Sequence, residues 1–264
     1  MVTPYKHLKL TVQDRIWRVT LNRPQVHNAF NAELIEELRS AFEEVGSYSL
    51  GEVRAVVLAG EGPSFCAGAD VNWMRASLNL TEEDNVQDAL RMARMFDTIN
   101  RCRVPVVGRI HGLALGGGVG LVAVCDIVVA VEDARFAFSE VKLGIIPAVI
   151  SPYVLARIGQ SHARALFLTA ERFGADRAAR IGLVHIVVPP DRLDEEVERV
   201  LREINTSAPE AVARAKELIA TLPHLPPDEV MMHTARTIAS LRVGEEGQEG
   251  LRAFLEKRKP RWAR

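Results

Sequence analysis

The glycine-rich stretch between Arg109 and Asp126 constrains the fold of this chain more than any other segment. It reads R-I-H-G-L-A-L-G-G-G-V-G-L-V-A-V-C-D and contains five glycines. Because glycine inside an ordered element carries an entropic cost, such a cluster indicates a sharp turn or a close approach of the backbone to another group. A strand-like apolar run (104–110) leads into it, and a helix-like apolar run (119–124) follows. Free N–H groups and the helix dipole at such a junction predict an anion or oxyanion site.

A dinucleotide-binding loop is the main alternative interpretation of these glycines. Gly118-x-Gly120-x-x-Ala123 has the spacing of that fingerprint, and Glu140 lies 20 residues beyond Gly120. The crossover helix between two parallel strands, however, needs about ten residues or more. Asp126 follows Gly120 after only six residues. A P-loop is excluded because no Gly-Lys-Ser/Thr sequence follows, so the spacing favours the oxyanion site.

Length and charge narrow the class of protein. The 264 residues suit one large domain, or a core domain with a helical appendage. The 33 basic and 34 acidic residues nearly cancel, which argues against a general nucleic-acid or anionic-membrane binder. The absence of a signal-peptide pattern and of a long apolar span predicts a cytoplasmic protein with no membrane segment. Cys66, Cys102 and Cys125 form no CxxC motif and are expected to be reduced and buried.

The apolar pattern alternates between strand and helix in the first part of the chain. Asn31 is expected to cap the first helix, and the acidic residues at 82–84 suit the positive end of the second. From Asp191 onward the pattern is helical. This order predicts an α/β fold with a largely buried sheet and a helical C-terminal third. The predicted strands are 8–12, 16–21, 53–59, 104–110, 127–131 and 184–188, and the predicted early helices are 31–46 and 81–101.

A second loop of small residues, F-C-A-G-A-D at 65–70, follows the predicted strand 53–59 and leads into a helix through Trp73 and Met74. Taken alone, a tight turn capped by Asp70 explains it. Two such loops, each after a buried strand, can direct backbone N–H groups at one carbonyl oxygen. Acyl-transfer and enolate chemistry need this arrangement, in which each donor is worth roughly 3–4 kcal/mol in the transition state.

These motifs together resemble the crotonase (enoyl-CoA hydratase/isomerase) superfamily. The residues that carry the resemblance are Asn22-Arg23-Pro24, Asn28-Ala29-Phe30-Asn31, F-C-A-G-A-D, L-G-G-G and Cys125-Asp126. The match extends to A-F-L-E-K-R-K-P near the C-terminus and covers nearly the whole chain. It implies an α/β crotonase (ClpP-like) fold, with a repeated ββα spiral core over residues 1–200 that carries the CoA and oxyanion site. Residues 201–264 would form a helical trimerisation region.

The resemblance also implies catalytic roles. It assigns the two oxyanion donors to the backbone N–H groups of Ala69 and Gly117, and an acid–base role to Glu140. The other glutamate of the family's hydratases would fall at Gly120, so this chain departs from the two-glutamate pattern. Taken without the resemblance, Glu140 is equally explained as a solvated carboxylate paired with Lys142 or Arg135. An apolar pocket of Phe136, Phe138, Val141 and Leu143 is expected to raise its pKa.

The resemblance further implies a set of substrate contacts. Phe254 and Lys257 would reach the CoA across a subunit boundary, although Lys257 is equally explained as a solvated charge. Trp73 and Met74 either line the acyl pocket or pack. His27 and His111 are interpreted as structural or polar contacts, and Asp126 as a packing residue. The implied substrate and CoA contacts are Gln25, Val26, His27, Ala29, Ala67, Asp70, Val71, Trp73, Met74, Gly120, Ala148, Phe254 and Lys257.

The expected activity is that of an enoyl-CoA hydratase, a hydro-lyase that adds water reversibly to a 2-enoyl-CoA. The sequence around Glu140 resembles single-glutamate hydratases of the methylglutaconyl-CoA type, which act in leucine degradation. A Δ3,Δ2-enoyl-CoA isomerase and a non-catalytic acyl-CoA-binding or RNA-binding family member are the alternatives. The resemblance implies a homotrimer or homohexamer with an acyl-CoA substrate, no metal and no cofactor beyond the CoA of the substrate. A membrane partner is not expected, and a nucleic-acid partner is disfavoured.

Overall fold

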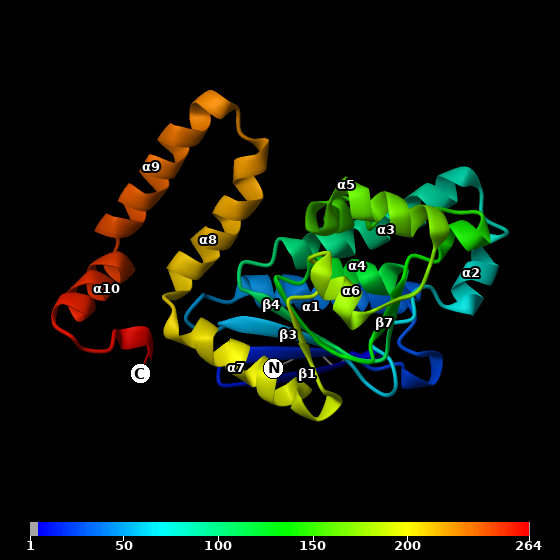
Figure 1. The fold of residues 1–264 in the computed structure, drawn as a ribbon, viewed down its shortest axis with the longest axis horizontal. Coiled ribbons are helices and arrows are strands. Elements are labelled where there is room, and N and C mark those ends of the chain that lie inside the picture. Colours follow the sequence, from blue (N-terminus) through cyan, green and yellow to red (C-terminus); the bar gives the residue numbers. More distant parts are fainter. Residues whose placement is uncertain (1–4, 264) are drawn as a thin grey trace.

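A six-stranded sheet forms the centre of the molecule in the computed structural model, which describes residues 5–263 (Figure 1). The strand order is β1-β2-β3-β4-β6-β9, with β1 antiparallel to β2 and all other neighbours parallel. The chain therefore opens with a hairpin and continues as a parallel sheet. The strands are β1 (Leu8–Gln13), β2 (Ile16–Leu21), β3 (Ala55–Gly60), β4 (Val106–Ile110), β6 (Ile127–Val131) and β9 (Ile186–Val188).

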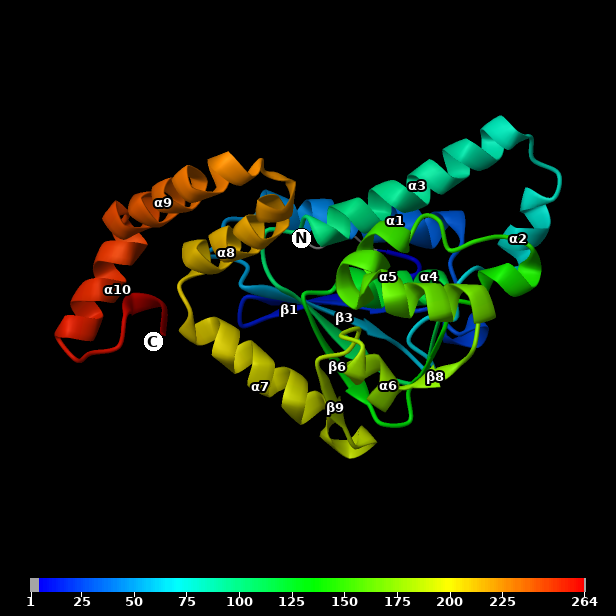
Figure 2. The same ribbon diagram turned by 45° about the horizontal axis from the view of Figure 1, so that its top comes forward.

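Every residue of β3 is buried, as expected for a central parallel strand covered on both faces. Helices α1 (Ala32–Ser47) and α3 (Glu82–Asn100) pack against each other, and α7 (Leu193–Thr206) packs against β4 and β6. In both ribbon views α3 and α7 lie on opposite sides of the strands (Figures 1 and 2). The predicted sheet and helices are therefore confirmed, with boundaries moved by a few residues.

Helix starts follow local capping chemistry. The Asn31 side chain accepts a hydrogen bond from the Leu34 N–H at 2.8 Å, which confirms the predicted cap of α1. Thr81 and Asp84 form a capping box at the start of α3. The other helices of the core are α2 (Val71–Ser77), α4 (Gly117–Val124), α5 (Ser151–Thr169) and α6 (Ala175–Arg180).

A small three-stranded sheet lies beside the main one and was not predicted. It consists of β5 (Leu113–Leu115), β7 (Arg135–Ala137) and β8 (Phe173–Gly174), in the order β5-β7-β8. Strands of two or three residues are too short to show an apolar period, so they could not be predicted from the sequence. Phe136 of β7 stacks on Phe173 of β8 at 5.6 Å between ring centroids, which fixes the two strands together.

The C-terminal helices α8 (Pro209–Thr221), α9 (Pro227–Val243) and α10 (Glu245–Leu255) extend away from the sheet as an arm (Figures 1 and 2). Where the arm leaves the core, Lys216 Nζ contacts Asp126 Oδ2 at 2.6 Å, and Asp126 also accepts a hydrogen bond from the Val106 N–H. Asp126 therefore joins elements rather than performing chemistry, as predicted.

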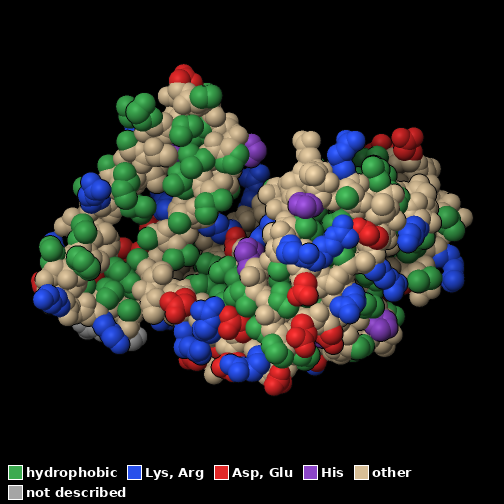
Figure 3. Space-filling view, viewed as in Figure 1, with side chains coloured by type: hydrophobic (Ala, Val, Ile, Leu, Met, Phe, Trp, Pro, Cys, Tyr) green, Lys and Arg blue, Asp and Glu red, His purple; other side chains and the backbone are tan. Residues whose placement is uncertain are grey.

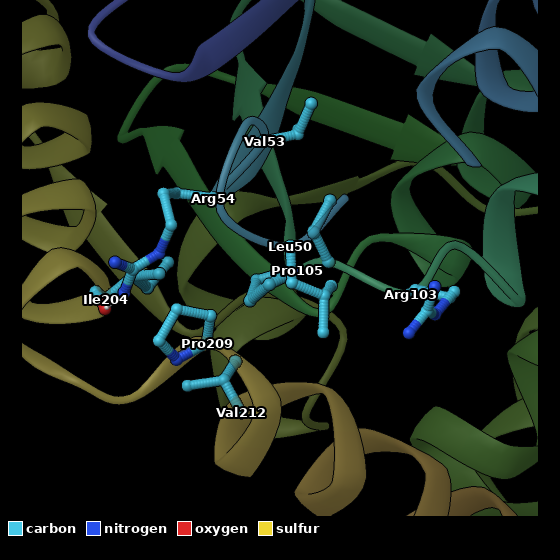
Figure 4. Close-up of a pocket in the computed structure, with 9 residues that line it drawn as sticks. Leu50, Val53, Arg54, Arg103, Pro105, Ile204, Pro209 and Val212 are labelled. Carbon is cyan, nitrogen blue, oxygen red and sulfur yellow. Dashed lines mark hydrogen bonds between the residues drawn. The ribbon is translucent and has the colours of Figure 1, made fainter. Parts of the chain in front are cut away.

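Arg54 holds the junction between α7 and the arm. Its Nη2 donates to the main-chain carbonyls of Ile204 and Ser207, and its Nη1 lies buried without a partner among the residues that the structure describes. A cavity of about 10 Å³ adjoins it, with the side chains of Arg54, Ile204, Pro209 and Val212 around it (Figure 4). This volume suits a single water molecule, which would satisfy the unpaired N–H group.

Large apolar side chains lie exposed along the arm, and the space-filling view shows them as patches over α8, α9 and α10 (Figure 3). None of the helices in the described part of the chain has the length and apolar character needed to cross a bilayer. The exposed large apolar residues of the arm are Ile219, Met231, Met232, Ile238, Val243, Leu251, Phe254 and Leu255.

Candidate active site

Two loops meet at one edge of the main sheet because they follow neighbouring parallel strands. β3 ends at Gly60 and leads into loop 61–70, while β4 ends at Ile110 and leads through β5 to the glycines that open α4. The loops are joined by backbone hydrogen bonds: the Cys66 N–H donates to the Leu113 carbonyl, and the Leu115 N–H donates to the Cys66 carbonyl, both at 3.0 Å. The convergence predicted from the sequence is confirmed.

Glycine is required where the loops touch. Gly116 precedes α4 with φ 49° and ψ −119°, and Gly68 has φ +88°, both backbone conformations that side chains disfavour. A Cβ on Gly68 would lie 2.9 Å from the Leu115 carbonyl oxygen and 3.9 Å from the backbone nitrogen of Gly117. The two loops are therefore within van der Waals contact, and a side chain at position 68 would separate them.

Two backbone N–H groups are left without acceptors at this contact. Phe30 pairs with Ala69 in a parallel bridge, in which the Phe30 N–H donates to the Gly68 carbonyl and the Asp70 N–H donates to the Phe30 carbonyl. This pairing leaves the N–H of Ala69 itself unused. The N–H of Gly117, at the first position of α4, likewise donates to nothing within residues 5–263. Both N–H groups are therefore free to donate hydrogen bonds to one oxyanion between the two loops.

An ion pair holds the Ala69 loop. Arg23 contacts Asp70 at 2.8 Å, with side chains that are 11% and 6% exposed, and Arg23 also donates to the Ala29 carbonyl. Asp70 accepts a hydrogen bond from the Asn72 N–H and so caps α2. Burial alone would raise the pKa of Asp70, but the hydrogen bonds from Asn72 and Arg23 outweigh it and lower the pKa. The Asp70 carboxylate is thus committed to protein partners.

Glu140 lies against the other loop. It is the first residue of a short 3₁₀ helix (Glu140–Leu143) that follows β7, and β7 pairs with β5. A Cβ on Gly116 would lie 3.1 Å from the Glu140 Oε1 atom. Its Oε2 is buried and has no hydrogen-bond partner in the described chain. Burial raises the pKa of Glu140 above its usual value. A partly buried carboxyl with one unsatisfied oxygen is suited to exchange protons with a guest.

The solvated alternative for Glu140 does not match this environment. Arg135 instead donates to the Ala134 carbonyl, and no ion pair joins Glu140 to Lys142 or Arg135 in the part of the chain that is described. The expectation that Leu143 helps to enclose Glu140 is wrong, because Leu143 is 58% exposed. Phe136 and Phe138 are fully buried, and their rings pack against Phe173 and Phe167.

Apolar side chains lie against two other glycines at the start of α4, Gly117 and Gly120. A Cβ on Gly117 would lie 2.9 Å from the Phe30 ring, and one on Gly120 would lie 2.3 Å from Ile150 Cγ2 and 2.9 Å from the Phe96 ring. Sequence reasoning did not identify Phe96, and from segment 148–152, which holds Ile150, it named only Ala148 as a contact. Phe96 follows Met92 at helical spacing, which indicates a buried helix face but not what that face meets.

Most of the remaining predicted contacts lie either in the segment before α1 or on α2. Gln25 and Val26 lie in a 3₁₀ turn (Pro24–Val26) before His27, whose carbonyl accepts a hydrogen bond from Ala67 at 2.9 Å. Ala29 follows in the same segment, so these residues lie beside the Ala69 loop. Val71, Trp73 and Met74 lie on α2, where Val71 is 67% exposed and Trp73 packs against the core. Ala148 follows the Glu140 turn and is exposed.

Phe254 and Lys257 lie elsewhere. Phe254 belongs to α10 and Lys257 follows it, at the end of the molecule opposite α2 (Figures 1 and 2). Both are exposed. A single chain therefore brings the loop residues together with Glu140 but does not bring Phe254 or Lys257 to them.

His27 and His111, the two histidines considered in the sequence analysis, have structural partners. His27 Nδ1 lies 3.0 Å from Ser64 Oγ, and His111 Nε2 lies 2.8 Å from the Gly62 carbonyl oxygen. Both contacts tie loop 61–70 to its neighbours, in line with the predicted structural role. Across residues 5–263, no group of three or more His, Cys, Asp or Glu side chains is arranged to hold a metal ion.

The three cysteines are free and buried near these elements, as expected. Burial raises the pKa of Cys66, beneath the two loops, to about 12, and that of Cys125, at the end of α4, to about 12 as well. It also raises the pKa of Cys102, which follows α3. Thiols with such pKa values stay protonated and are poor nucleophiles.

Comparison with known proteins agrees with this geometry. Residues 11–264 match the model of the enoyl-CoA hydratase/isomerase family. A short-chain-enoyl-CoA hydratase from Clostridium acetobutylicum is 33% identical over 252 residues, covering 95% of both chains. A crystal structure of an enoyl-CoA hydratase from Shewanella pealeana has a TM-score of 0.93 at 38% identity, over 97% of this chain and 96% of that one. AtuE from Pseudomonas aeruginosa has a TM-score of 0.94 at 36% identity, over 98% and 100%. These matches, together with two free backbone N–H groups beside a partly buried glutamate, show that the chain belongs to the enoyl-CoA hydratase/isomerase (crotonase) family.

Proposed function

We propose that this protein is an enoyl-CoA hydratase, which adds water reversibly to a 2-enoyl-CoA thioester. The observation that carries the proposal is the placement of Glu140 against Gly116, directly before the free N–H of Gly117. The names of the relatives support the same activity, because the matching curated proteins include enoyl-CoA hydratases.

The reaction can be written on these groups. The thioester oxygen accepts hydrogen bonds from the N–H groups of Ala69 and Gly117. Glu140 takes a proton from water as the water oxygen bonds to the β-carbon, and the double-bond electrons move onto the thioester oxygen. The resulting enolate is stabilised by the two donors, each worth roughly 3–4 kcal/mol. Glu140 then returns its proton to the α-carbon, which gives the 3-hydroxyacyl-CoA and restores the carboxylate.

We further infer that the CoA part of the substrate lies along segment 25–29, Ala67 and α2, because these residues border the Ala69 loop. Phe254 and Lys257 would contact it only from a second copy, since they lie at the opposite end of their own chain. A homotrimer or homohexamer, as the family resemblance implies, would bring them there.

The test is a panel of 2-enoyl-CoA and 3-enoyl-CoA substrates with identification of each product by mass spectrometry and chromatography. Water addition to the 2-enoyl substrates is expected. Glu140→Gln should lower kcat by at least about 100-fold, because general acid–base catalysis contributes that much. Hydration that survives this substitution would contradict the assignment of Glu140.

A Δ3,Δ2-enoyl-CoA isomerase is the second candidate, and one observation favours it. The side chains around Gly120 are apolar. Within residues 5–263, Glu140 is the one carboxyl among the nearest contacts of a Cβ placed on any of the glycines 116, 117, 118 and 120. A single base is sufficient to move a proton between the α- and γ-carbons. Conversion of 3-enoyl-CoA to 2-enoyl-CoA without hydration, in the same panel, would establish this activity instead.

A further inference from the structure

We propose that Ile150 is a specificity-determining residue, which fills the space over Gly120 and limits the size of the acyl group. This inference rests on the proposed acyl-CoA activity. It concerns the acyl chain and leaves the thioester chemistry at Ala69 and Gly117 as described.

Two close contacts lie at the start of α4. Gly116 caps α4 and Gly120 lies one turn along it, and the Gly120 N–H donates to the Gly116 carbonyl. A Cβ on Gly116 would meet the carboxyl of Glu140, and a Cβ on Gly120 would meet a methyl group of Ile150. Glu140 and Ile150 therefore contact positions one turn apart at the start of α4.

Ile150 and Gly120 are sterically complementary. The 2.3 Å between Ile150 Cγ2 and a Cβ built on Gly120 is far below any allowed carbon–carbon contact, so only glycine fits opposite this isoleucine. The space in which the family's other glutamate would begin is thus filled with hydrocarbon. Ile150 is 3% exposed and immediately precedes α5, a position that leaves its side chain little freedom to move aside.

Phe96 completes the barrier. Its ring lies 2.9 Å from the same built Cβ, and it packs edge-on to Phe30 at 6.3 Å between ring centroids and tilted to Tyr153 at 6.1 Å. Phe30 in turn borders Gly117, while Tyr153 lines an open hollow between α1 and α3 on the outer surface. Ile150, Phe96 and Tyr153 therefore form a continuous apolar layer between Gly120 and that hollow.

A closed apolar end favours short acyl groups. A substrate whose thioester oxygen lies between Ala69 and Gly117, and whose β-carbon lies near Glu140, would direct its tail toward the space that Ile150 fills. Each methylene that does not fit is expected to lower kcat/KM by about tenfold or more. The wild-type protein should therefore prefer crotonyl-CoA to longer straight-chain substrates.

The experiment measures kcat and KM of the wild type and of Ile150→Ala for crotonyl-, hexenoyl-, octenoyl- and decenoyl-CoA. The ratio of kcat/KM for octenoyl-CoA to that for crotonyl-CoA should rise at least about tenfold in the variant, mainly through KM. Ile158→Ala is the matched control. Ile158 lies on α5, is as buried as Ile150, and loses the same atoms when it is replaced by alanine. An unchanged chain-length profile in Ile150→Ala would overturn the inference, whereas no turnover of any substrate by the wild type would overturn the proposed function.

A double-mutant cycle on the melting temperature tests the contact between Gly120 and Ile150 without an activity assay. Gly120→Ala should lower the melting temperature because its Cβ meets Ile150. In Gly120→Ala/Ile150→Ala the clash with Ile150 is removed while the contact with Phe96 remains, so the second substitution should recover part of the loss. Strict additivity of the two changes in melting temperature would contradict the complementarity. Ile150→Val, which keeps most of the side chain, provides the folded intermediate case and should shift the chain-length profile less than Ile150→Ala.

Discussion

At the scale of single residues, the environment of Glu140 connects stability with catalysis. Its carboxyl is partly buried, one oxygen lacks a partner, and burial raises its pKa. A carboxyl in such surroundings is costly to ionise and is therefore a stronger base once ionised. The same desolvation that makes it reactive opposes folding, as is common at active sites.

The pH dependence of activity should reveal this shift. Glu140 must be ionised to take a proton from water, so kcat/KM should fall as the pH drops through its raised pKa. The acidic limb of the profile is expected above the ordinary glutamate value of 4.5. Steady-state kinetics with a stable enoyl-CoA across the acidic range would measure it. A limb at or below the ordinary value would show that burial does not control Glu140.

Glu140→Gln should also be more stable than the wild type at neutral pH. Because the folded-state pKa is raised, the folded protein holds the Glu140 proton more tightly than the unfolded chain. That contribution to stability is complete below the unfolded value near 4.5 and is lost as the pH rises through the folded pKa. Thermal melts should therefore show a gain for the glutamine variant at neutral pH that shrinks toward acid. A gain of the same size at every pH would point to packing rather than charge.

Several site residues were accessible from the sequence and others were not. The small-residue patterns identified the two loops, because glycine and alanine clusters after strands signal a close backbone approach, and the family resemblance then assigned the donors to Ala69 and Gly117. Phe96 and Ile150 carried no such signal, since an apolar residue on a helix or at a helix start looks alike whether it faces the core or a substrate. Which of them meets Gly120 depends on how α3 and α5 cross α4.

At the scale of elements, the site depends on ties between segments that are distant in sequence. Arg23 and Asp70 join the segment after β2 to the start of α2 and hold the loop that presents Ala69. The sequence predicted the cap by Asp70 but not this pair. The longer strands and helices were predictable from their apolar periods, whereas the β5-β7-β8 sheet depends on long-range pairing of very short segments.

Asp70→Ala should destabilise the protein by about 3 kcal/mol, because it leaves the Arg23 charge buried without its partner and removes the cap of α2. Urea unfolding monitored by circular dichroism would measure the change. Glu36→Ala is the control, because Glu36 forms an exposed pair with Arg39 within α1 and should cost less than about 1 kcal/mol. Equal losses in the two variants would show that the Arg23–Asp70 pair has no special role.

At the scale of the whole molecule, the arm leaves apolar surface uncovered. Phe254, Met231 and Leu255 are 82%, 79% and 78% exposed, on helices that extend away from the core. Contiguous exposed apolar surface is typical of an association surface. The proposed homotrimer or homohexamer would cover it with another copy.

Met231→Asp should therefore weaken self-association at least about tenfold, because it places a charge on the exposed apolar surface of the arm that the proposed interface would bury. Sedimentation velocity over a range of concentrations would measure the shift toward monomer. Leu78→Asp serves as the control, because Leu78 is 82% exposed at the end of α2, on the opposite side of the molecule from the arm (Figures 1 and 2). A wild type that sediments as a fully active monomer would contradict the assembly.

The buried thiols have a practical consequence for following motion in this molecule. An alkylating reagent can reach Cys66, Cys102 or Cys125 only when the surrounding layer opens, and each thiol samples a different layer: the paired loops, the end of α3 and the end of α4. The labelling rate of each native cysteine would therefore report local opening of its own part of the fold, with no engineered probe. If an added acyl-CoA slows the alkylation of Cys66 but not of Cys102 or Cys125, ligand binding stabilises the two loops without stabilising the ends of α3 and α4.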